Sequence, residues 1–293
     1  GRYGARRMSA PIELPKWADV SLVPVLAVIV AFLIAGLVVL GIGENPAKAT
    51  ALLIKGALGS GEGLGYTLYY ATNFIFTGLA VAIAFHAGLF NIGGEGQATI
   101  GGLGAALVCL HLDFLPWYFV LPLAILGTMI MGALWAFIPG YLQVKRGSHV
   151  VITTIMFNFL AATLVVYLLV NVIGKPGSMS PETRVFSETA HLPYLHEALA
   201  YFGIKIPKSP LNLSFIFALF ASAFVWVLIW HTRLGYAIRT VGHNPTAAIY
   251  AGISIGRITM ITMAMSGALA GLLAVNEILG VQGRLLLEFS SGY

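Results

Sequence analysis

Residues Gly88 to Val108 read GLFNIGGEGQATIGGLGAALV. This stretch is long enough to cross a bilayer as a helix, for which about 20 residues suffice, yet it contains Asn91, Glu95, Gln97 and many glycines. A carboxylate in hydrocarbon costs at least about 2.5 to 3.5 kcal/mol, so an intramembrane acid usually faces a protein interior or a wet cavity. We therefore expect Glu95 to face away from lipid.

The glycines of this stretch predict close helix packing. Small residues four apart on a helix form a ridge along which two backbones can approach each other, and four residues fit that spacing: Gly94, Ala98, Gly102 and Ala106. The segment GALAG, between Gly267 and Gly271, offers a second face of the same kind.

The polar residues of this stretch have two interpretations. Asn91 and Glu95 are four apart and would share a helix face, and the pair Gly93 and Gly94 would break or bend the helix near its cytoplasmic end. A polar face beside a tight seam fits a substrate pathway. Equally, Glu95 could cap or hydrogen-bond neighbouring backbone in a packed bundle without touching substrate.

The composition indicates a polytopic membrane protein with an all-α fold. Of the 293 residues 58% are hydrophobic and only 9% are charged, whereas soluble domains carry about 25% charged residues. The net charge of +5 does not indicate nucleic-acid binding, because the cations punctuate apolar runs instead of clustering on a polar surface. The single cysteine, Cys109, excludes an intramolecular disulfide and any CxxC motif.

Seven apolar runs are long enough to cross a membrane: 21–42, 66–86, 88–110, 114–139, 149–173, 213–232 and 257–280. Short-loop cations set orientation, and counting spans between the cation clusters places them all on one side, which we take as cytoplasmic. These clusters are the N-terminal one, Lys145 with Arg146, and Arg233, Arg239 and Arg257. The first run exceeds the 7 to 15 residues of a signal-peptide core, so we interpret it as a retained span.

This topology divides the chain into a cytoplasmic segment, 1–20, and a transmembrane domain, 21–293. The polar stretches 43–65 and 174–212 then lie outside, and 174–212 is expected to be an ordered loop with short helices. The loop 233–256 lies in the cytoplasm. Because the chain stops about a dozen residues after the seventh span, we expect further spans beyond Tyr293.

Two other spans carry amides at membrane depth. Asn158 lies about ten residues, or roughly 15 Å, into its span, with Thr154 one turn earlier. Asn73 lies eight residues into an earlier span. Such side chains either line a pathway or form interhelical hydrogen bonds that only hold the bundle together. We carry six residues as pathway candidates: Asn73, Asn91, Glu95, Gln97, Thr154 and Asn158.

The cytoplasmic loop HTRLGYAIRTVGHNPTAAIYAGISIGR is too patterned to be only a turn. Asn244 is a good N-cap, Pro245 suits the first helical position, and Thr246 to Ala251 are small and apolar. A short helix is therefore expected. It either inserts into a groove of a partner protein or lies at the interface beneath the bundle.

Three ordered motifs give the chain a family resemblance from about Tyr66 to its end. GLFNIGGEGQATIG, VITTIMFNFLA and RTVGHNPTAAIYAGI resemble the permease subunits of ATP-binding-cassette (ABC) importers for branched-chain amino acids, ribose-type sugars and nucleosides. The first motif is most similar to the nucleoside-type branch. One departure is Val150, where relatives usually carry Glu, so any role of that acid does not carry over.

The resemblance implies a multi-pass subunit of the bacterial plasma (inner) membrane. Its partners would be a second permease subunit, in a homo- or heterodimer, a cytoplasmic ATPase, an extracytoplasmic solute-binding protein and membrane lipid, without nucleic acid. The 233–256 loop would be the element that couples to the ATPase, with these residues: Arg239, Gly242, His243, Asn244, Ala247, Ala248 and Gly252.

The expected function is passage of a small polar solute, nucleosides foremost, with sugars or branched-chain amino acids as alternatives. The chain holds no GxxxxGK[ST], HExxH or GxSxG motif, so we expect no catalysis and no cofactor in it, with ATP and Mg²⁺ bound by the partner ATPase. An ion-coupled secondary transporter would carry broken acidic segments in two repeated halves, and we identify only one.

Overall fold

The computed structural model describes Pro15 and residues 18–290, and within this part of the chain it is all-helical apart from three isolated bridges. The chain divides into two compact units, residues 1–60 and 61–293. The predicted division at residue 20 is between a cytoplasmic segment and a transmembrane domain, and it remains a prediction. The first predicted span belongs to the smaller unit because it buries none of its residues.

The described part of the smaller unit contains two α-helices. A π-helical turn, Ala18–Leu22, leads into α1, Val23–Gly41, the first predicted span. The second helix, α2, Pro46–Leu58, was not predicted and lies in the stretch assigned only as polar. It begins where the Asn45 side chain accepts hydrogen bonds from two backbone amides, at 2.9 and 3.3 Å. The predicted N-terminal cation cluster lies outside the described residues.

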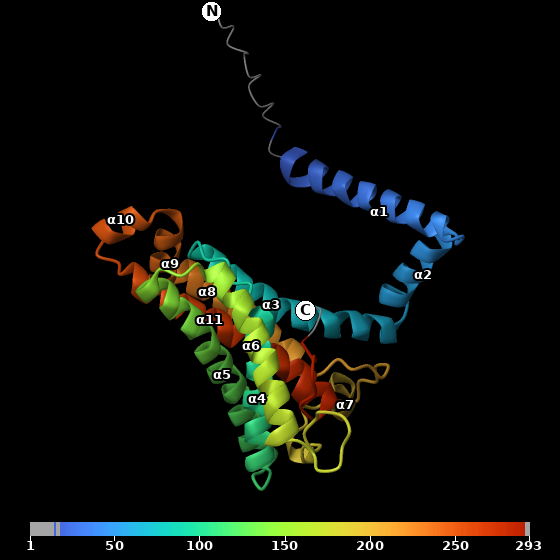
Figure 1. Ribbon diagram of the computed structural model, residues 1–293. Coiled ribbons are helices and arrows are strands. Elements are labelled where there is room, and N and C mark those ends of the chain that lie inside the picture. Colours follow the sequence, from blue (N-terminus) through green and yellow to red (C-terminus); the bar gives the residue numbers. More distant parts are fainter. Residues whose placement is uncertain (1–14, 16–17, 291–293) are drawn as a thin grey trace, which may run out of the picture. The chain divides into compact units, whose positions relative to one another are not determined.

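The larger unit is a bundle of long helices with short ones at its two ends (Figure 1). The long helices are α3 (Gly61–His86), α4 (Gly94–His111), α5 (Trp117–Arg146), α6 (Val150–Asn171), α8 (Ser214–His231) and α11 (Ile255–Gly271), the last followed by a π-helix, Val275–Gln282. The short helices are α7 (Leu195–Tyr201), α9 (Arg233–His243) and α10 (Pro245–Tyr250), with a 3₁₀ turn, Glu188–Ala190.

Six helices of the described chain are long and apolar enough to cross a membrane, and they match six of the seven predicted spans. The exception is α4, which was predicted over 88–110. It starts only at Gly94, because residues 88–93 are not helical, and its first turns are polar. Eleven of its 18 residues are buried against other helices, so α4 does not require the apolar surface that faces lipid.

Glycines allow α4, α5 and α11 to pack backbone against backbone. A Cβ added at Gly101 of α4 would lie 2.6 Å from the Cα of Gly271 on α11, and one at Gly267 would collide with the carbonyl of Gly132 on α5. Contacts this close exclude any side chain. The second predicted small-residue face, Gly267 to Gly271, therefore lies in one of these close crossings.

The predicted α4 ridge differs from the observed crossing. Ala98, Gly102 and Ala106 are buried, but Gly94 has open space around it and is not a packing residue. A Cβ on Gly102 would meet the side chains of Phe289 and Ile278 instead of another backbone. The closest backbone approaches of α4 are made at Gly101 and Gly104 instead, toward α11 and α5.

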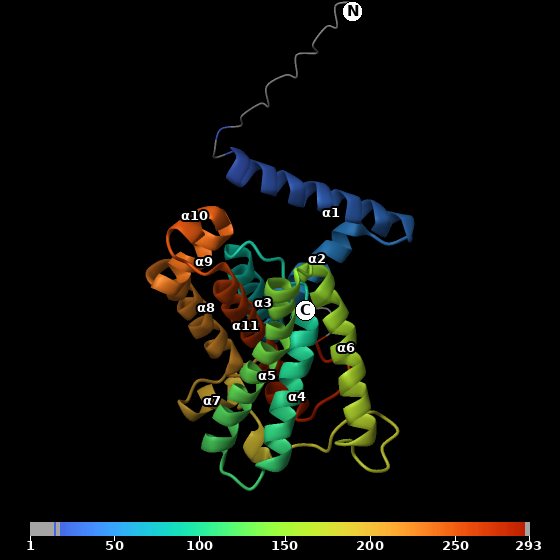
Figure 2. The same ribbon diagram turned by 60° about the vertical axis from the view of Figure 1, so that its left-hand side comes forward.

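The two ends of the larger unit differ in charge. One end carries α9, α10 and the α5–α6 turn, and the other carries α7 and the α4–α5 turn (Figure 2). Lys145 and Arg146 end α5 close to the start of α11, since a Cβ on Gly256 would meet Val144. Two of the three predicted cation clusters, Lys145 with Arg146 and Arg233, Arg239 and Arg257, thus lie at one end of the larger unit.

The opposite end is closed by residues 172–213, which wrap around the π-helix. Backbone amides of Thr183, Phe186 and Leu192 donate hydrogen bonds of 2.7 to 3.1 Å to carbonyls between residues 279 and 285. Two ion pairs add to this end, Arg184–Asp113 at 2.7 Å and Arg284–Glu182 at 3.0 Å. The segment predicted as an ordered loop is therefore held by main-chain contacts.

Candidate functional site

A non-helical turn, residues 87–93, separates α3 from α4, and the Asn91 side chain organises it. Its Nδ2 donates to Gln97 Oε1 (3.0 Å) and Ser266 Oγ (2.8 Å), while its Oδ1 accepts from the Gln97 amide (3.0 Å) and the Gly93 backbone (2.9 Å). An amide side chain can make four such bonds. Asn91 is therefore saturated, and it has no capacity left for a ligand.

The start of α4 is capped from another helix. Asn158 of α6 accepts a 2.9 Å hydrogen bond from the Gly96 backbone amide and donates one of 3.0 Å to the Ile92 carbonyl. The Gly96 amide is one of the N–H groups that a helix N-terminus leaves without an intrahelical partner, and the Ile92 carbonyl belongs to the turn before the helix. The Asn158 amide keeps one further donor and one further acceptor position.

A pocket of about 410 Å³ opens at this broken helix start. Its walls come from α3, the 87–93 turn, α4, α6 and the chain after α11. The lining residues are Thr77, Ala80, Val81, Phe90, Asn91, Ile92, Gly94, Glu95, Ala98, Asn158, Leu273 and Ser290. Three of the six predicted pathway residues, Asn91, Glu95 and Asn158, thus meet in one pocket.

Glu95 gives this pocket its charge. It lies exposed in the first turn of α4, where the helix dipole favours a negative group. Asn91 precedes the helix, so the two do not share a helix face as predicted, although both line the pocket. Phe90 adds an exposed aromatic ring, stacked on Phe85 with centroids 5.2 Å apart. The pocket therefore combines an anionic acceptor, an amide and an aromatic face.

The other three predicted pathway residues do not line this pocket. Gln97 is buried behind it and bonded to Asn91. Thr154 is buried, donates to the Val151 carbonyl and packs where a Cβ on Gly93 would lie. These two residues support the 87–93 turn on the side away from the pocket.

The third, Asn73, belongs to a buried polar network that sequence reasoning missed. Glu277 on the π-helix accepts hydrogen bonds from Asn73 Nδ2 (2.6 Å) and the Tyr69 hydroxyl (2.7 Å). Its neighbour Asn276 donates to Asn73 Oδ1 (2.8 Å) and accepts from Ser214 Oγ (2.7 Å). The network ties α3, α8 and the π-helix together.

A signal for this network was present in the sequence. The run GLLAVNEILG places an acid within the last apolar span, as GGEGQ does in the third. A second acid, Glu277, therefore lies within an apolar span, in addition to the predicted Glu95. Glu95 lies in the first turn of α4, directly after the non-helical turn, and Glu277 lies in a π-helix, a form often found at functional sites.

The predicted loop helix is present as α10. Asn244 caps it by accepting a 3.1 Å hydrogen bond from the Ala247 amide, and Gly252 ends the following turn with φ +74°. Ala248 is fully buried within the chain, so it is not available to a partner. The other residues of α10 are exposed, and its outward apolar side chains include Ala247, Ile249 and Tyr250, the last two 62% and 89% exposed.

The preceding helix, α9, packs against the turn that leads to Asn91. A Cβ on Gly242 would collide with the His86 carbonyl, and one on Gly88 would lie 3.4 Å from the Gly242 Cα. Arg239 points back onto α8, with its guanidinium 4.6 Å from the Trp230 ring centroid. His243 is exposed at the end of α9. Of the predicted coupling residues, Arg239 and Gly242 therefore contact the bundle.

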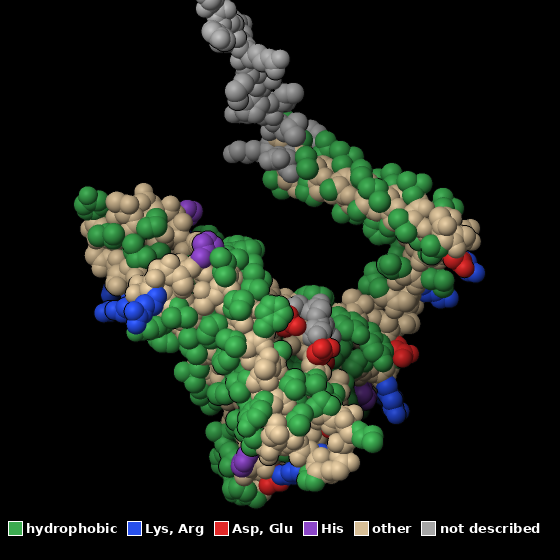
Figure 3. Space-filling model, in the orientation of Figure 1, with side chains coloured by type: hydrophobic (Ala, Val, Ile, Leu, Met, Phe, Trp, Pro, Cys, Tyr) green, Lys and Arg blue, Asp and Glu red, His purple; other side chains and the backbone are tan. Residues whose placement is uncertain are grey.

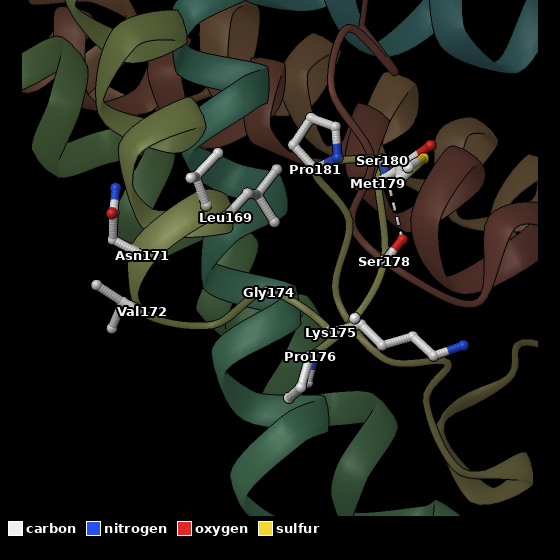
Figure 4. A pocket seen from close by; sticks show the side chains of 12 residues that line it. Leu169, Asn171, Val172, Gly174, Lys175, Pro176, Ser178, Met179, Ser180 and Pro181 are labelled. Carbon is white, nitrogen blue, oxygen red and sulfur yellow. Dashed lines mark hydrogen bonds between the residues drawn. The ribbon is translucent and has the colours of Figure 1, made fainter.

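A further pocket of about 500 Å³ lies at the opposite end, where α6 passes into residues 172–181 (Figure 4). Asn171 and Ser178 are among its polar lining residues. In Figure 4 the Lys175 side chain extends away from Leu169 and Pro181. None of the predicted pathway residues lies in this pocket.

Comparisons with known proteins agree with the family that the motifs suggested. Residues 63–292 match the family described as branched-chain amino acid transport system, permease component. The guanosine ABC transporter permease protein NupP of Bacillus subtilis (strain 168) is 38% identical over 261 residues, which cover 88% of this chain and 72% of the relative. No solved structure matches.

Two more relatives are similar to this chain. The nucleoside ABC transporter permease protein NupB of Lactococcus lactis subsp. cremoris (strain MG1363) is 34% identical over 86% of this chain and 68% of its own length. The glucose ABC transporter permease protein TsgB13 of Haloferax volcanii is 34% identical over 96% and 73%. With six apolar spans and these relatives, the chain is a multi-pass membrane protein that belongs to the permease component family of the branched-chain amino acid transport system.

Proposed function

We propose that the chain forms half of the translocation pathway of an ABC importer for nucleosides. The pocket at the broken start of α4 carries this proposal, because it holds Glu95 and Asn158 beside the Phe90 ring. Two of the relatives above carry guanosine or nucleoside in their names. A nucleoside has ribose hydroxyls that donate to a carboxylate, and a base whose face stacks on an aromatic ring.

Glu95 and Asn158 are the residues we assign to substrate contact. Glu95 is exposed in the pocket, and Asn158 has one donor and one acceptor position to spare. Asn91, Gln97 and Thr154 support the pocket wall instead, because their polar groups are already bonded within the protein.

We further propose that α10 seats in a partner ATPase through Ala247, Ile249 and Tyr250. Nucleotide-driven movement of α10 would pass to α9 and then, through the contact of Gly242 with residues 86–88, to the turn that precedes Asn91. A continuous series of contacts thus joins the exposed helix α10 to the pocket at the start of α4. ATP and Mg²⁺ belong to the partner, and this chain supplies no catalytic group.

The remaining partners follow from the family. Permease subunits of ABC importers work with an ATPase and a solute-binding protein. We propose that a second permease subunit completes the pathway, and that residues 174–212 lie outside and receive the binding protein. Loops 174–212 and 233–256 occupy opposite ends of the bundle, which supports this assignment.

Glucose is the second candidate substrate, because the Haloferax relative is a glucose permease by name. Uptake of labelled guanosine and labelled glucose by vesicles that contain the complete transporter distinguishes the two. The nucleoside proposal requires ATP-dependent guanosine accumulation that excess unlabelled guanosine abolishes and excess glucose does not. Competition by glucose alone would assign the pocket to sugars.

A further inference from the structure

A second site lies at the cation-rich end of the bundle, apart from the Glu95 pocket. It is a pocket of about 420 Å³ formed by the last turns of α3 and α8 and by α9, with these lining residues: Phe85, His86, Trp230, Arg239, Gly242 and His243. It shares no lining residue with the pocket at the start of α4. It is therefore a separate pocket, although His86 and Gly242 in its wall also form the contact between α9 and residues 86–88 described above.

Arg239 is held in this pocket without an anionic partner. Its guanidinium carbon lies 4.6 Å from the Trp230 ring centroid, and Trp230 in turn packs edge-on against His86 at 5.9 Å. The Arg239 Nε is buried and has no hydrogen-bond acceptor within the described protein. A buried N–H group without an acceptor is unfavourable, so this side chain is oriented for an acceptor that the chain does not supply.

The charges around the pocket favour an anion as that acceptor. No acidic residue lines it. Both ion pairs of the described residues, Arg184–Asp113 and Arg284–Glu182, lie at the other end of the bundle. Figure 3 shows Lys and Arg side chains gathered near α9 and α10, with no acidic side chain among them on this face. An anion here would meet the Arg239 guanidinium, with further Lys and Arg side chains at the same end of the bundle and no acid in the pocket wall.

The position of the pocket indicates which kind of anion binds. Phe85 and Trp230 end two apolar spans, α3 and α8, and each is 52% exposed. Aromatic rings at span ends mark the membrane–water interface, where phospholipid headgroups lie. A ligand at this depth must combine an anionic group for Arg239 with an apolar body beside the two rings.

We propose that this pocket binds the headgroup of an anionic phospholipid. The planar guanidinium can donate two parallel hydrogen bonds to a phosphate, and basic pockets between span ends are suited to anionic headgroups. Phe85 and Trp230 would then contact the glycerol and the upper acyl chain. A bound lipid would brace α9 against α3 and α8.

The test measures lipid binding to the purified protein, so it does not depend on transport. Thermal unfolding in mild detergent is followed while dioleoyl phosphatidylglycerol, dioleoyl phosphatidylcholine or inorganic phosphate is added, and native mass spectrometry counts retained lipids. We expect phosphatidylglycerol to stabilise the wild type at about tenfold lower concentration than phosphatidylcholine. Arg239→Gln should abolish this preference. Arg239→Lys keeps the positive charge but lacks the paired N–H donors of the guanidinium, so it should weaken the preference.

Arg257→Gln is the matched control, because Arg257 is exposed at the same end and does not line the pocket. It should keep the lipid preference. Equal loss in both Gln variants would mean a diffuse charge effect and would overturn the site. If inorganic phosphate stabilised the protein and the lipids did not, the pocket would bind a soluble anion, and the lipid proposal would be overturned. Equal affinity of the wild type for both lipids would refute the proposal even if the Arg239 variants failed to fold.

Discussion

The carboxylate of Glu277 accepts a 2.6 Å hydrogen bond from the side-chain amide of Asn73, which lies 204 residues earlier in the chain. This bond joins α3 to the π-helix in the interior of the bundle. The Tyr69 hydroxyl donates to the same carboxylate oxygen. A polar pair at this depth specifies how the helices meet, because a donor left without its acceptor in the interior is costly.

Replacing Glu277 tests that role. Glu277→Gln keeps an acceptor oxygen and should unfold within about 2 °C of the wild type, whereas Glu277→Leu removes the acceptor for Asn73 and Tyr69. The expected cost of Leu is about 2 to 5 kcal/mol, seen as a clear drop in thermal stability in detergent. Glu62→Leu, at an exposed acid of α3, is the control. A Leu variant as stable as the wild type would assign the network no structural role.

The glycine crossing gives a matched pair of substitutions. Gly101→Ala places a Cβ 2.6 Å from Gly271 Cα, so α4 and α11 must move apart, with an expected cost of about 1 to 3 kcal/mol. Gly78→Ala adds a methyl to an exposed face of α3 with no atom within 4 Å, and should stabilise by about 0.5 to 1 kcal/mol. Folded yield and thermal unfolding measure both. Equal stability of the two variants would contradict the close contact between Gly101 and Gly271.

The exposed residues of α10 test the contact with an ATPase. Ala248→Glu would bury a carboxylate inside the loop itself, so its failure would not distinguish docking from misfolding. Tyr250→Asp changes a side chain that is 89% exposed and should leave the permease folded while the ATPase no longer copurifies. Tyr201→Asp, at a similarly exposed site on the opposite end, should keep the ATPase. Normal copurification with Tyr250→Asp would place the contact elsewhere.

Sidedness can be read with single cysteines, because the native Cys109 is buried. His149→Cys lies at the turn between α5 and α6, and Val185→Cys lies in the segment at the opposite end; both positions are exposed. A membrane-impermeant maleimide added to intact cells should label Val185→Cys only. Labelling of His149→Cys alone from outside would show the opposite orientation in the membrane. Labelling of both variants would contradict the proposed order of spans.

The sequence predicted most of the fold because span length, apolar composition and capping act locally. Six spans, the break before Gly94 and the Asn244 cap are all encoded within short stretches. The partners of buried groups are not local. Asn91 and Ser266 lie 175 residues apart, and Asn73 and Glu277 lie 204 apart, so no spacing rule pairs them.

Tertiary contacts also decide which of the predicted residues face the pocket. Gln97 shares a helix with Glu95, yet it turns inward to bond Asn91. Ala248 was expected to face a partner, but the fold of α9 and α10 covers it. In both cases the side chain faces the protein because of contacts that helix periodicity alone does not predict.

The central claim is that Glu95 contacts a nucleoside in an ATP-driven pathway. The direct test is accumulation of labelled guanosine by proteoliposomes that contain this chain, its second permease subunit and the ATPase, with binding protein outside and ATP on the ATPase side. We predict accumulation that requires ATP and falls about tenfold or more in Glu95→Gln, because a charge-assisted hydrogen bond is lost, while Glu62→Gln transports normally. Guanosine flux without ATP, or full uptake by Glu95→Gln, would contradict the account.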